Sequence, residues 1–401
     1  MSPAGVLRKP RRATAPRVSA SANGSAGKRV LFAGGGTGGH LYPALALADA
    51  LREQRTDIRT HFVGARRGVE ARVLPDRGVE YTLLPLEPLR RDRVWQNWRL
   101  LPASARGLRG LRALFRSFRP DLVVGTGGYA SGFAGAYAVA ARVALGIQEQ
   151  NAYPGLTQRV LSRYARQVHL GFPEAERHLK PGARTRIFVL GNPIRPPDPG
   201  LHAGDCRAHF GLSRDAVVAL IVGGSQGSLA INEALTGALE LVAAARLSRP
   251  AGLEVLWATG PAHIDAIRAR LALIQLEWVH AVDYIHDMPR ALAAASLAVS
   301  RAGAMATAEL LAWGVAAILI PLPTAAADHQ RVNAEALAAA GAAIDLPQSQ
   351  LTAERLWSEL TALVGDAARR ATMAKHARAR GKPDAARQIA QRLLLLLEDR
   401  A

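Results

Sequence analysis

A glycine-rich segment that ends in a histidine is the first place in this chain where chemistry could occur. The stretch "GGTGGH" covers residues 35–40 and stands between an apolar run and a helical pattern. Glycine-rich turns ahead of helices point backbone N–H groups outward, and the helix dipole adds positive potential, so such turns bind anions. A neutral imidazole near a bound diphosphate is a suitable general base. His40 is therefore a candidate base, and the alternative is a histidine that only caps or packs.

Two further glycine-rich turns follow, "GTGGYASG" at residues 125–132 and "GGSQGS" at residues 223–228. Three such turns indicate more than one phosphate-bearing ligand. The first turn lacks the acidic ribose ligand of a dinucleotide-binding motif, and the chain has no G-x-x-x-x-G-K-[ST] sequence. It also has no HExxH, CxxC or Asp-x-Asp sequence, so we expect no metal and no cofactor. Helix N-termini and arginine would then neutralise the diphosphate.

Two polar clusters in the second half of the chain could recognise a nucleotide sugar. Glu309 lies in a helical pattern about two turns after Gly303, where a carboxylate can accept hydrogen bonds from both hydroxyls of a ribose. The alternative is a carboxylate that the helix dipole favours. Residues 327–337, "ADHQRVNAEAL", gather hydrogen-bonding side chains just before another helix. This density suits a sugar, and the alternative is an ordinary N-terminal cap by Asp328.

Buried parallel strands have to position these groups. Short runs rich in Val, Ile and Leu, such as "RVLFAGG", "DLVVGTGG" and "VVALIVGGS", alternate with longer helical patterns. Continuous hydrophobicity predicts strands covered on both faces, and the alternation predicts an α/β protein with parallel sheets. A strand feeds a glycine-rich turn at residues 30–39 and again at 219–228, which predicts two doubly wound domains joined by the Pro-rich segment 191–200. The active site is expected between them, at the carboxyl ends of the strands.

The chain is strongly basic, with 51 Lys and Arg against 32 Asp and Glu and a formal net charge of +19. An anionic partner would fit this excess, as would an arginine-rich composition overall. Residues 1–26 contain no acidic side chain and are expected to form a disordered basic tail. Residues 88–121 interleave arginines with Trp95 and Trp98. For the 90–101 portion we favour contact with an anionic membrane surface over single-stranded nucleic acid or packing on the sheet.

Together these motifs resemble those of the MurG family, the UDP-N-acetylglucosamine–N-acetylmuramyl-(pentapeptide) pyrophosphoryl-undecaprenol N-acetylglucosaminyltransferases. The resemblance covers about residues 28–390 and rests on the order and spacing of six motifs. They are "GGTGGH" at 35–40, "GGYASG" at 127–132, "EQN" at 149–151, "GNPIR" at 191–195, "GGSQGS" at 223–228 and "DHQRVNA" at 328–334.

The resemblance implies a GT-B fold, in which two Rossmann-like domains with parallel sheets face an interdomain cleft. Residues 27–192 would form the acceptor and membrane-associating domain, and residues 193–380 the UDP-GlcNAc-binding domain. Residues 381–401 would form a C-terminal helix that packs back toward the N-terminal domain.

The implied reaction moves GlcNAc from UDP-GlcNAc to the C4 hydroxyl of the muramyl sugar of lipid I, with inversion, and makes lipid II for peptidoglycan synthesis. Inversion requires in-line attack, a base at the acceptor hydroxyl and donors at the departing diphosphate. His40 is our first choice of base and Glu149 the second. The implied contacts to UDP-GlcNAc are Thr37, Gly38, Gly39, Asn151, Arg195, Ser225, Ile285, Ala304, Met305, Ala306, Thr307, Ala308, Glu309 and Gln330.

The implied acceptor is lipid-linked, so its diphosphate site and the membrane contact would share the N-terminal domain. Thr37, Gly38 and Gly39 are also implied to receive this diphosphate. Its other implied contacts are Gly36, Gly127, Gly128, Tyr129 and Ser131. The implied membrane contacts are Arg90, Arg91, Arg93, Val94, Trp95, Trp98, Arg99, Leu100 and Leu101. The resemblance implies a peripheral protein on the cytoplasmic face of the bacterial inner membrane, with other cell-wall synthesis and division proteins as candidate partners and no nucleic acid.

Three places depart from the family pattern. Gln148 replaces the histidine of "HEQN", Ala302 replaces the serine of "RSGA", and residues 324–327 read "TAAA" where a histidine and a second aspartate are more usual. Other reactions on a similar fold are UDP-GlcNAc 2-epimerisation, against which the "GGYASG" turn argues, and diacylglycerol glucosylation. A basic nucleic-acid-binding protein would leave the glycine-rich turns unexplained.

Overall fold

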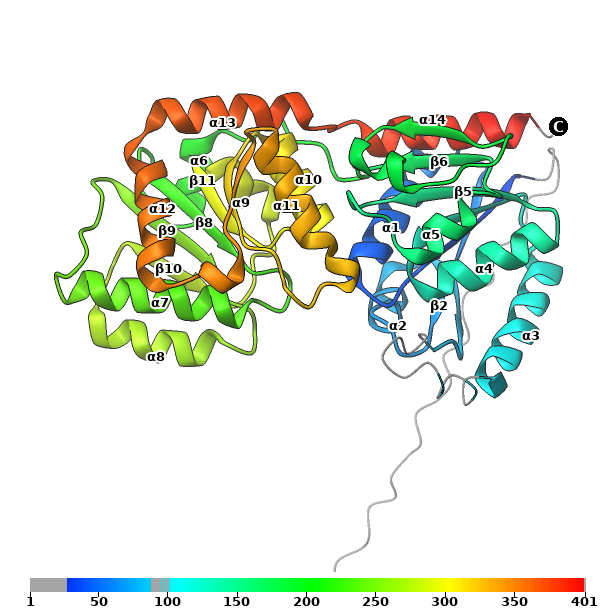
Figure 1. Cartoon of the computed structure of the whole chain (residues 1–401), viewed down its shortest axis with the longest axis horizontal. Coiled ribbons are helices and arrows are strands. Elements are labelled where there is room, and N and C mark those ends of the chain that lie inside the picture. The colour runs from blue at the N-terminus through cyan, green and yellow to red at the C-terminus, as the bar shows by residue number, and fades with distance from the viewer. Residues whose placement is uncertain (1–26, 88–94, 96–97, 99–100, 400–401) are drawn as a thin grey trace, which may run out of the picture.

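The computed structural model describes residues 27–87, 95, 98 and 101–399, which form two α/β domains, each built on one sheet (Figure 1). The N-terminal sheet has the strand order β3-β2-β1-β4-β5-β6-β7, and the C-terminal sheet has the order β10-β9-β8-β11-β12-β13. Each pairing among these strands is parallel. The predicted α/β class with two parallel sheets is confirmed.

The N-terminal domain owes its buried strands to apolar residues on both faces of the sheet. In β1, Leu31 and Ala33 face one core, whereas Val30 and Phe32 face the other, and all four are fully buried. This double coverage is why the hydrophobic runs do not alternate with polar residues. The strands are β1 (Arg29–Gly34), β2 (Arg59–Ala65), β3 (Glu80–Leu84), β4 (Leu122–Gly127), β5 (Ala144–Glu149), β6 (Gln167–Leu170) and β7 (Arg186–Val189). The helices are α1 (Gly38–Gln54), α2 (Glu70–Val73), α3 (Leu101–Phe118), α4 (Gly128–Ala140) and α5 (Leu156–Leu161), with 3-10 turns at Pro75–Arg77 and Pro173–His178.

The C-terminal domain is built in the same way. In its central strand β8, Val218 and Leu220 pack in one core and Ala219 and Ile221 in the other. Its strands are β8 (Val217–Val222), β9 (Leu253–Ala258), β10 (Val279–Val282), β11 (Leu297–Ser300), β12 (Ala316–Leu319) and β13 (Ala343–Asp345). Its helices are α6 (Ala203–His209), α7 (Leu229–Ala243), α8 (Ile264–Ile274), α9 (Met288–Ala294), α10 (Ala304–Trp313), α11 (His329–Ala339), α12 (Ala353–Gly365) and α13 (Ala367–Arg380), with 3-10 turns at Ala326–Asp328 and Gln348–Gln350.

The last helix, α14 (Ala385–Glu398), leaves the C-terminal domain and packs on the N-terminal one (Figure 1). Ile389 and Leu393 are fully buried in the same cluster as Phe32 of β1. Gly146 of β5 makes room for this helix, because a Cβ there would lie 3.0 Å from Leu393 Cδ2. The chain therefore crosses between the domains twice, after β7 and after α13.

An ion pair and a ring contact brace the second crossing. Arg380, the last residue of α13, lies with Nη2 2.6 Å from both carboxylate oxygens of Glu174 in the N-terminal domain. Its guanidinium also lies 5.7 Å from the centre of the Phe172 ring. A planar guanidinium can make both contacts at once, and this fixes the end of α13 against the other domain.

Only part of the expected membrane segment falls within the described residues. Trp95 and Trp98 are 72% and 63% exposed. From α3, Leu111, Phe115 and Phe118 are buried against the sheet. Outside the described residues lie the 1–26 tail, Arg90, Arg91, Arg93, Val94, Arg99 and Leu100, together with the side chain of Leu101. Within the described ranges, no helix combines the length and the apolar character that crossing a bilayer needs.

Candidate active site

The glycine-rich turns occur where the strand order of each sheet reverses. The turn at 35–40 follows β1 and the turn at 127–132 follows β4, its neighbour in the N-terminal sheet. The turn at 223–228 follows β8, and the polypeptide leading into α10 follows its neighbour β11. In doubly wound sheets the reversal leaves a crevice at the carboxyl ends of these two strands, which is where ligands bind. Each domain thus presents one ligand-binding edge.

His40 lies in the first turn of α1, directly after the first glycine-rich turn. Its Nδ1 is 3.2 Å from both Thr37 Oγ1 and the carbonyl oxygen of Gly35. A carbonyl oxygen can only accept, so Nδ1 carries the proton in this contact and Nε2 holds the lone pair of the neutral ring. Burial lowers the pKa of His40 below its ordinary value of 6.5, the Gly35 hydrogen bond partly offsets this, and His329 lowers the pKa further. The ring is consequently neutral and basic at neutral pH.

The second glycine-rich turn is shaped to accept the His40 ring. Gly127 and Gly128 have φ angles of 106° and 78°, which glycine adopts without strain. A Cβ on Gly127 would lie 2.6 Å from His40 Cδ2, and one on Gly128 would overlap the Gly35 carbonyl oxygen. Tyr129 then places its ring over Gly36, where a Cβ would lie 3.2 Å from Tyr129 Cε1. The two turns are therefore fitted to each other around the imidazole.

Two of the expected contacts to the acceptor diphosphate face away from a ligand. The Ser131 side chain is fully buried, and its Oγ would lie 2.5 Å from a Cβ on Gly125 beneath it. The N–H of Gly36 donates to Glu70 Oε2 at 2.9 Å. The Ser131 side chain and the Gly36 N–H thus lie toward the protein interior in this structure, and their expected roles stay predictions. Gly38 and Gly39 remain suitable, because they lie in the first turn of α1, where N–H groups lack an acceptor within the helix.

Glu149 ends β5 and holds the loop that follows it. Its side chain is buried, and Oε1 accepts from the Asn151 backbone N–H at 2.9 Å and from Asn151 Nδ2 at 3.2 Å. Oε2 accepts from the Gly155 N–H at 3.2 Å. Burial raises the pKa of Glu149 to about 7, although the hydrogen bonds from Asn151 and Gly155 oppose the increase. Both oxygens are engaged within the loop, so Glu149 is placed to hold Asn151 and is less available than His40 as a base.

Two buried asparagines connect the domains: Asn192, which we did not predict as a site residue, and Asn333, which we expected only within the polar cluster that suits a sugar. Asn333 of α11 accepts from the Ala152 N–H at 2.8 Å and donates to Asn151 Oδ1 at 3.2 Å. Asn192 donates to the carbonyl oxygens of Gln150 and Ala304, at 2.9 and 3.3 Å. Both lie inside motifs that the sequence showed, "DHQRVNA" and "GNPIR". Those motifs therefore encode contact between the domains as well as any ligand contact.

Gln148, which replaces the histidine of the family's "HEQN" motif, belongs to this buried network and does not occupy an exposed catalytic position. Gln148 is fully buried, and its Nε2 donates to Asn192 Oδ1 at 2.9 Å. Gln158 Nε2 in turn donates to the Gln148 carbonyl oxygen at 2.8 Å. A side chain at this position lies beneath the surface, so the missing histidine removes no base from the ligand-binding edge of the sheet.

Of the residues expected to hold the nucleotide, Ser225, Ile285 and the start of α10 follow the carboxyl ends of strands in the C-terminal sheet, whereas Arg195 lies between β7 and α6. Ser225 and Arg195 are exposed, while the Ile285 side chain is buried after β10. Glu309 lies in α10, and burial raises the pKa of its carboxyl group to about 7. The remaining expected contacts form the first turn of this helix: Ala304, Met305, Ala306, Thr307 and Ala308.

Gln330 and His329 lie at the start of α11. Gln330 Oε1 accepts from the Leu322 N–H at 3.0 Å, which leaves the amide N–H groups to meet a ligand. His329 Nδ1 lies 2.7 Å from the Ala326 carbonyl oxygen, so this ring too has its Nε2 free of that contact. His329, at the polar start of α11, acts electrostatically on His40 of the other domain and lowers its pKa.

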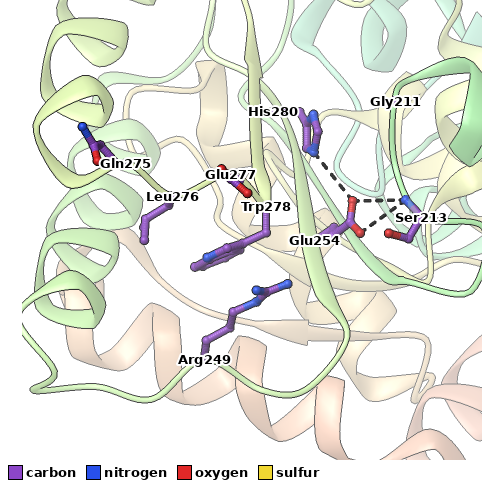
Figure 2. Close-up of a pocket in the computed structure, with 9 residues that line it drawn as sticks. All are labelled: Gly211, Ser213, Arg249, Glu254, Gln275, Leu276, Glu277, Trp278 and His280. Atoms are coloured by element: carbon purple, nitrogen blue, oxygen red, sulfur yellow. Dashed lines mark hydrogen bonds and ion pairs between the residues drawn. The ribbon is translucent and has the colours of Figure 1, made fainter.

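A separate pocket of about 470 Å³ opens at the amino ends of β9 and β10 (Figure 2). Arg249 lies over the Trp278 ring, 4.7 Å from its centre. Glu254 accepts from the Ser213 N–H at 3.3 Å and lies 3.6 Å from His280 Nε2 (Figure 2). This pocket occupies the edge of the sheet opposite the glycine-rich turn. Because it lies at the amino ends of these strands, the pocket does not form part of the candidate active site.

Two Rossmann-like domains whose carboxyl edges bear glycine-rich turns form the GT-B fold, and the family matches make this chain a glycosyltransferase of that fold. Residues 30–170 match the glycosyltransferase family 28 N-terminal domain, and residues 218–389 match the family 28 C-terminal domain. Within family 28, the chain belongs to the MurG family. It is 41% identical over 361 residues to the UDP-N-acetylglucosamine–N-acetylmuramyl-(pentapeptide) pyrophosphoryl-undecaprenol N-acetylglucosamine transferase of Syntrophotalea carbinolica, covering 90% of this chain and 97% of that protein.

Further relatives agree with this membership. The enzyme of the same name from Chlorobaculum tepidum is 39% identical over 372 residues, covering 92% of this chain and 99% of that protein. The crystal structure of Acinetobacter baumannii MurG superimposes with a TM-score of 0.72 at 28% identity, covering 91% of this chain and 98% of that one. A putative UDP-N-acetylglucosamine 2-epimerase from Listeria monocytogenes, with a TM-score of 0.62 and 17% identity, shares the fold. The predicted family and GT-B fold are confirmed.

Proposed function

We propose that this chain transfers GlcNAc from UDP-GlcNAc to the C4 hydroxyl of the muramyl sugar of lipid I and so makes lipid II. The names of its relatives describe such a transfer. The observation that carries the proposal is the neutral His40 ring, set where two glycine-rich turns meet at the ligand-binding edge of the N-terminal sheet. A transferase needs the combination of a base on one domain and a sugar-nucleotide site on the other.

The donor would bind to the C-terminal domain. The turn at 223–228 and the start of α7 would supply backbone N–H groups for the diphosphate, and the exposed Ser225 and Arg195 would be further donors. Glu309 would accept hydrogen bonds from the ribose hydroxyls, since burial keeps its carboxylate away from bulk water. Ile285 would meet uracil through its backbone. Gln330 has an amide nitrogen for the GlcNAc hydroxyls, because its oxygen is held by Leu322.

The acceptor would approach from the N-terminal domain. Gly38 and Gly39 at the start of α1 would bind its diphosphate, with Tyr129 and the glycines of the second turn beside them. His40 Nε2 would take the proton of the attacking hydroxyl as the oxygen bonds to C1 of GlcNAc and the C1–O bond to UDP breaks. Helix N-termini and Arg195 would stabilise the negative charge that develops on the departing UDP.

A lipid-linked acceptor requires the protein to work at a membrane surface. The exposed Trp95 and Trp98, next to the arginine-rich segment, support peripheral binding to an anionic cytoplasmic leaflet. Tryptophan places an apolar ring at the headgroup level, and arginine adds attraction to acidic lipids.

The test of the proposed function is acceptor-dependent release of UDP. The purified protein is incubated with UDP-GlcNAc and a short-chain lipid I analogue, and UDP and the glycosylated product are both measured. We expect one UDP for each product formed and little UDP without acceptor. Folded protein that binds UDP but gives no product would refute the proposal. Formation of UDP-ManNAc without acceptor would instead establish the epimerase reaction.

A further inference from the structure

Glu70, at the start of α2, is a fully buried carboxylate directly behind the first glycine-rich turn. Oε2 accepts from the Gly36 N–H at 2.9 Å, and Oε1 accepts from the N–H of Ala65, the last residue of β2, at 2.8 Å. One side chain therefore ties the turn after β1 to the end of the neighbouring strand. Both carboxylate oxygens are used for this purpose.

The surrounding backbone is fitted closely to this carboxylate. A Cβ on Gly64 would lie 2.5 Å from Glu70 Cγ, and Cβ atoms on Gly35 and Gly68 would overlap the carboxylate oxygens. Any side chain at these three glycines would collide with Glu70, so the backbone can approach the carboxylate this closely only as glycine. The orientation of the Gly36 N–H is thereby fixed.

The charge of Glu70 opposes the anion-binding role of the turn in front of it. It raises the pKa of His40, and together with burial and Glu87 it raises the pKa of Tyr129. A negative charge beside a diphosphate site weakens anion binding, so a carboxylate kept there needs a compensating role. What it supplies here is geometry, because the peptide that it holds carries the Gly35 carbonyl that receives Nδ1–H of His40.

We propose that Glu70 is a positioning residue for transfer: by holding the Gly36 N–H, it aims the Gly35 carbonyl at His40 and sets the N–H groups of Gly38 and Gly39 toward the acceptor diphosphate. This inference rests on the proposed function. Glu70 touches neither substrate and acts through the turn. Its loss should therefore impair the acceptor half of the reaction and leave the donor site in the other domain intact.

The test uses Glu70→Gln, which keeps the shape of the side chain but has one acceptor oxygen and one NH₂ group. One of the two buried N–H groups then faces a donor, so the turn cannot keep both contacts. We expect kcat/KM for the lipid I analogue to fall about tenfold or more, through a higher acceptor KM and a lower kcat. The KM for UDP-GlcNAc and the affinity for UDP should stay unchanged. A merely smaller folded fraction would lower kcat and leave both KM values alone.

The pH profile gives a second readout. The titratable groups that act on His40 are Glu70 and, from the other domain, His329. Removing the negative charge lowers the pKa of His40, so the acid limb of kcat/KM should move to lower pH in Glu70→Gln. Glu70→Asp keeps the charge but is one methylene too short to reach both N–H groups. It should lose acceptor kcat/KM about tenfold, with the acid limb moving less than in Glu70→Gln, because only the Gly35 hydrogen bond to His40 is weakened while the negative charge stays. It serves in place of Glu70→Gln if that variant does not fold.

The matched control is Glu80→Gln. Glu80 is an exposed carboxylate of β3 that pairs with Arg59 at the surface. It should behave as wild type in every assay. Glu70→Gln or a folded Glu70→Asp with wild-type acceptor kinetics would overturn the inference. Failure of the proposed function is distinguishable, because the wild-type protein itself would then release no UDP in response to acceptor.

Discussion

Replacing His40 by asparagine separates two tasks of the imidazole. The amide nitrogen of asparagine can take the place of Nδ1 and still donate to the Gly35 carbonyl, whereas no atom replaces Nε2. His40→Asn thus keeps the contact that holds the turn and removes the base. His40→Ala removes both.

The structure sets the size of each effect. A positioned general base accelerates a reaction about 10²–10⁴-fold, which corresponds to about 3–5 kcal/mol. The neutral hydrogen bond from Nδ1 to Gly35, at 3.2 Å, contributes about 0.5–1.5 kcal/mol, or about two- to tenfold. We therefore expect His40→Asn to lower kcat about 10²–10⁴-fold and His40→Ala to lower it only a few times more. The affinity for UDP should be unchanged in both.

Steady-state turnover with a short-chain acceptor and calorimetric titration with UDP measure these quantities, and His202→Asn, an exposed histidine outside the site, serves as the matched control. The pH dependence has a defined sign. Because burial lowers the pKa of His40, the ring stays neutral and active until the pH falls below that pKa, which is itself below 6.5. The acid limb of kcat should vanish in His40→Asn. Turnover within about tenfold of wild type, or a persisting limb, would refute the assignment of His40 as base.

Three further predictions concern the donor site, the domain contact and the membrane. Glu309→Gln should weaken UDP binding about tenfold or more, and wild-type affinity should increase as the pH rises through about 7, where this buried carboxyl group ionises; calorimetry across that pH tests both. Asn333→Ala leaves a buried N–H without an acceptor and should lower the free energy of unfolding by about 1–3 kcal/mol in urea titrations, and an unchanged midpoint would contradict this. Trp95→Ser with Trp98→Ser should reduce co-sedimentation with anionic vesicles, whereas Leu273→Ser, which alters an 84% exposed side chain on the other domain, should not; equal losses would argue against a local membrane contact.

The sequence allows the framework of the site to be predicted because that framework depends on local signals. Continuous apolar runs such as Val30–Ala33 identify strands buried on both faces, and a glycine-rich turn after such a strand marks its carboxyl end. Gly127 and Gly128 are needed for their positive φ angles and for close contact with His40, so the glycines of the motif indicate the shape of this turn. Signals of this kind can be recognised in the amino-acid sequence alone.

Other parts of the site depend on contacts that no local pattern reports. Glu70 reaches Gly36 across 34 residues of chain, because β2 pairs with β1, and nothing around it in sequence marks a buried carboxylate. Ser131 has the right residue type for a phosphate contact, but the phase of α4 turns it toward the sheet. In the sequence Asn333 is one polar residue among many, and only the folded structure shows that it accepts the Ala152 N–H of the other domain.

The path of α14 has a consequence for biosynthesis. The helix covers β1, β5 and α1 of the first domain, yet it follows the whole second domain in the chain and is therefore translated after it. While translation continues, the face of the N-terminal sheet that contains Phe32 lacks its cover, because Ile389 and Leu393 have yet to be translated. Domains generally fold as units during synthesis, N-terminal first. In this protein the sheet face around Phe32 is covered only after the second domain has been translated. A chain that stops before α14 would therefore leave that apolar face exposed, even though nearly every candidate active-site residue had been translated.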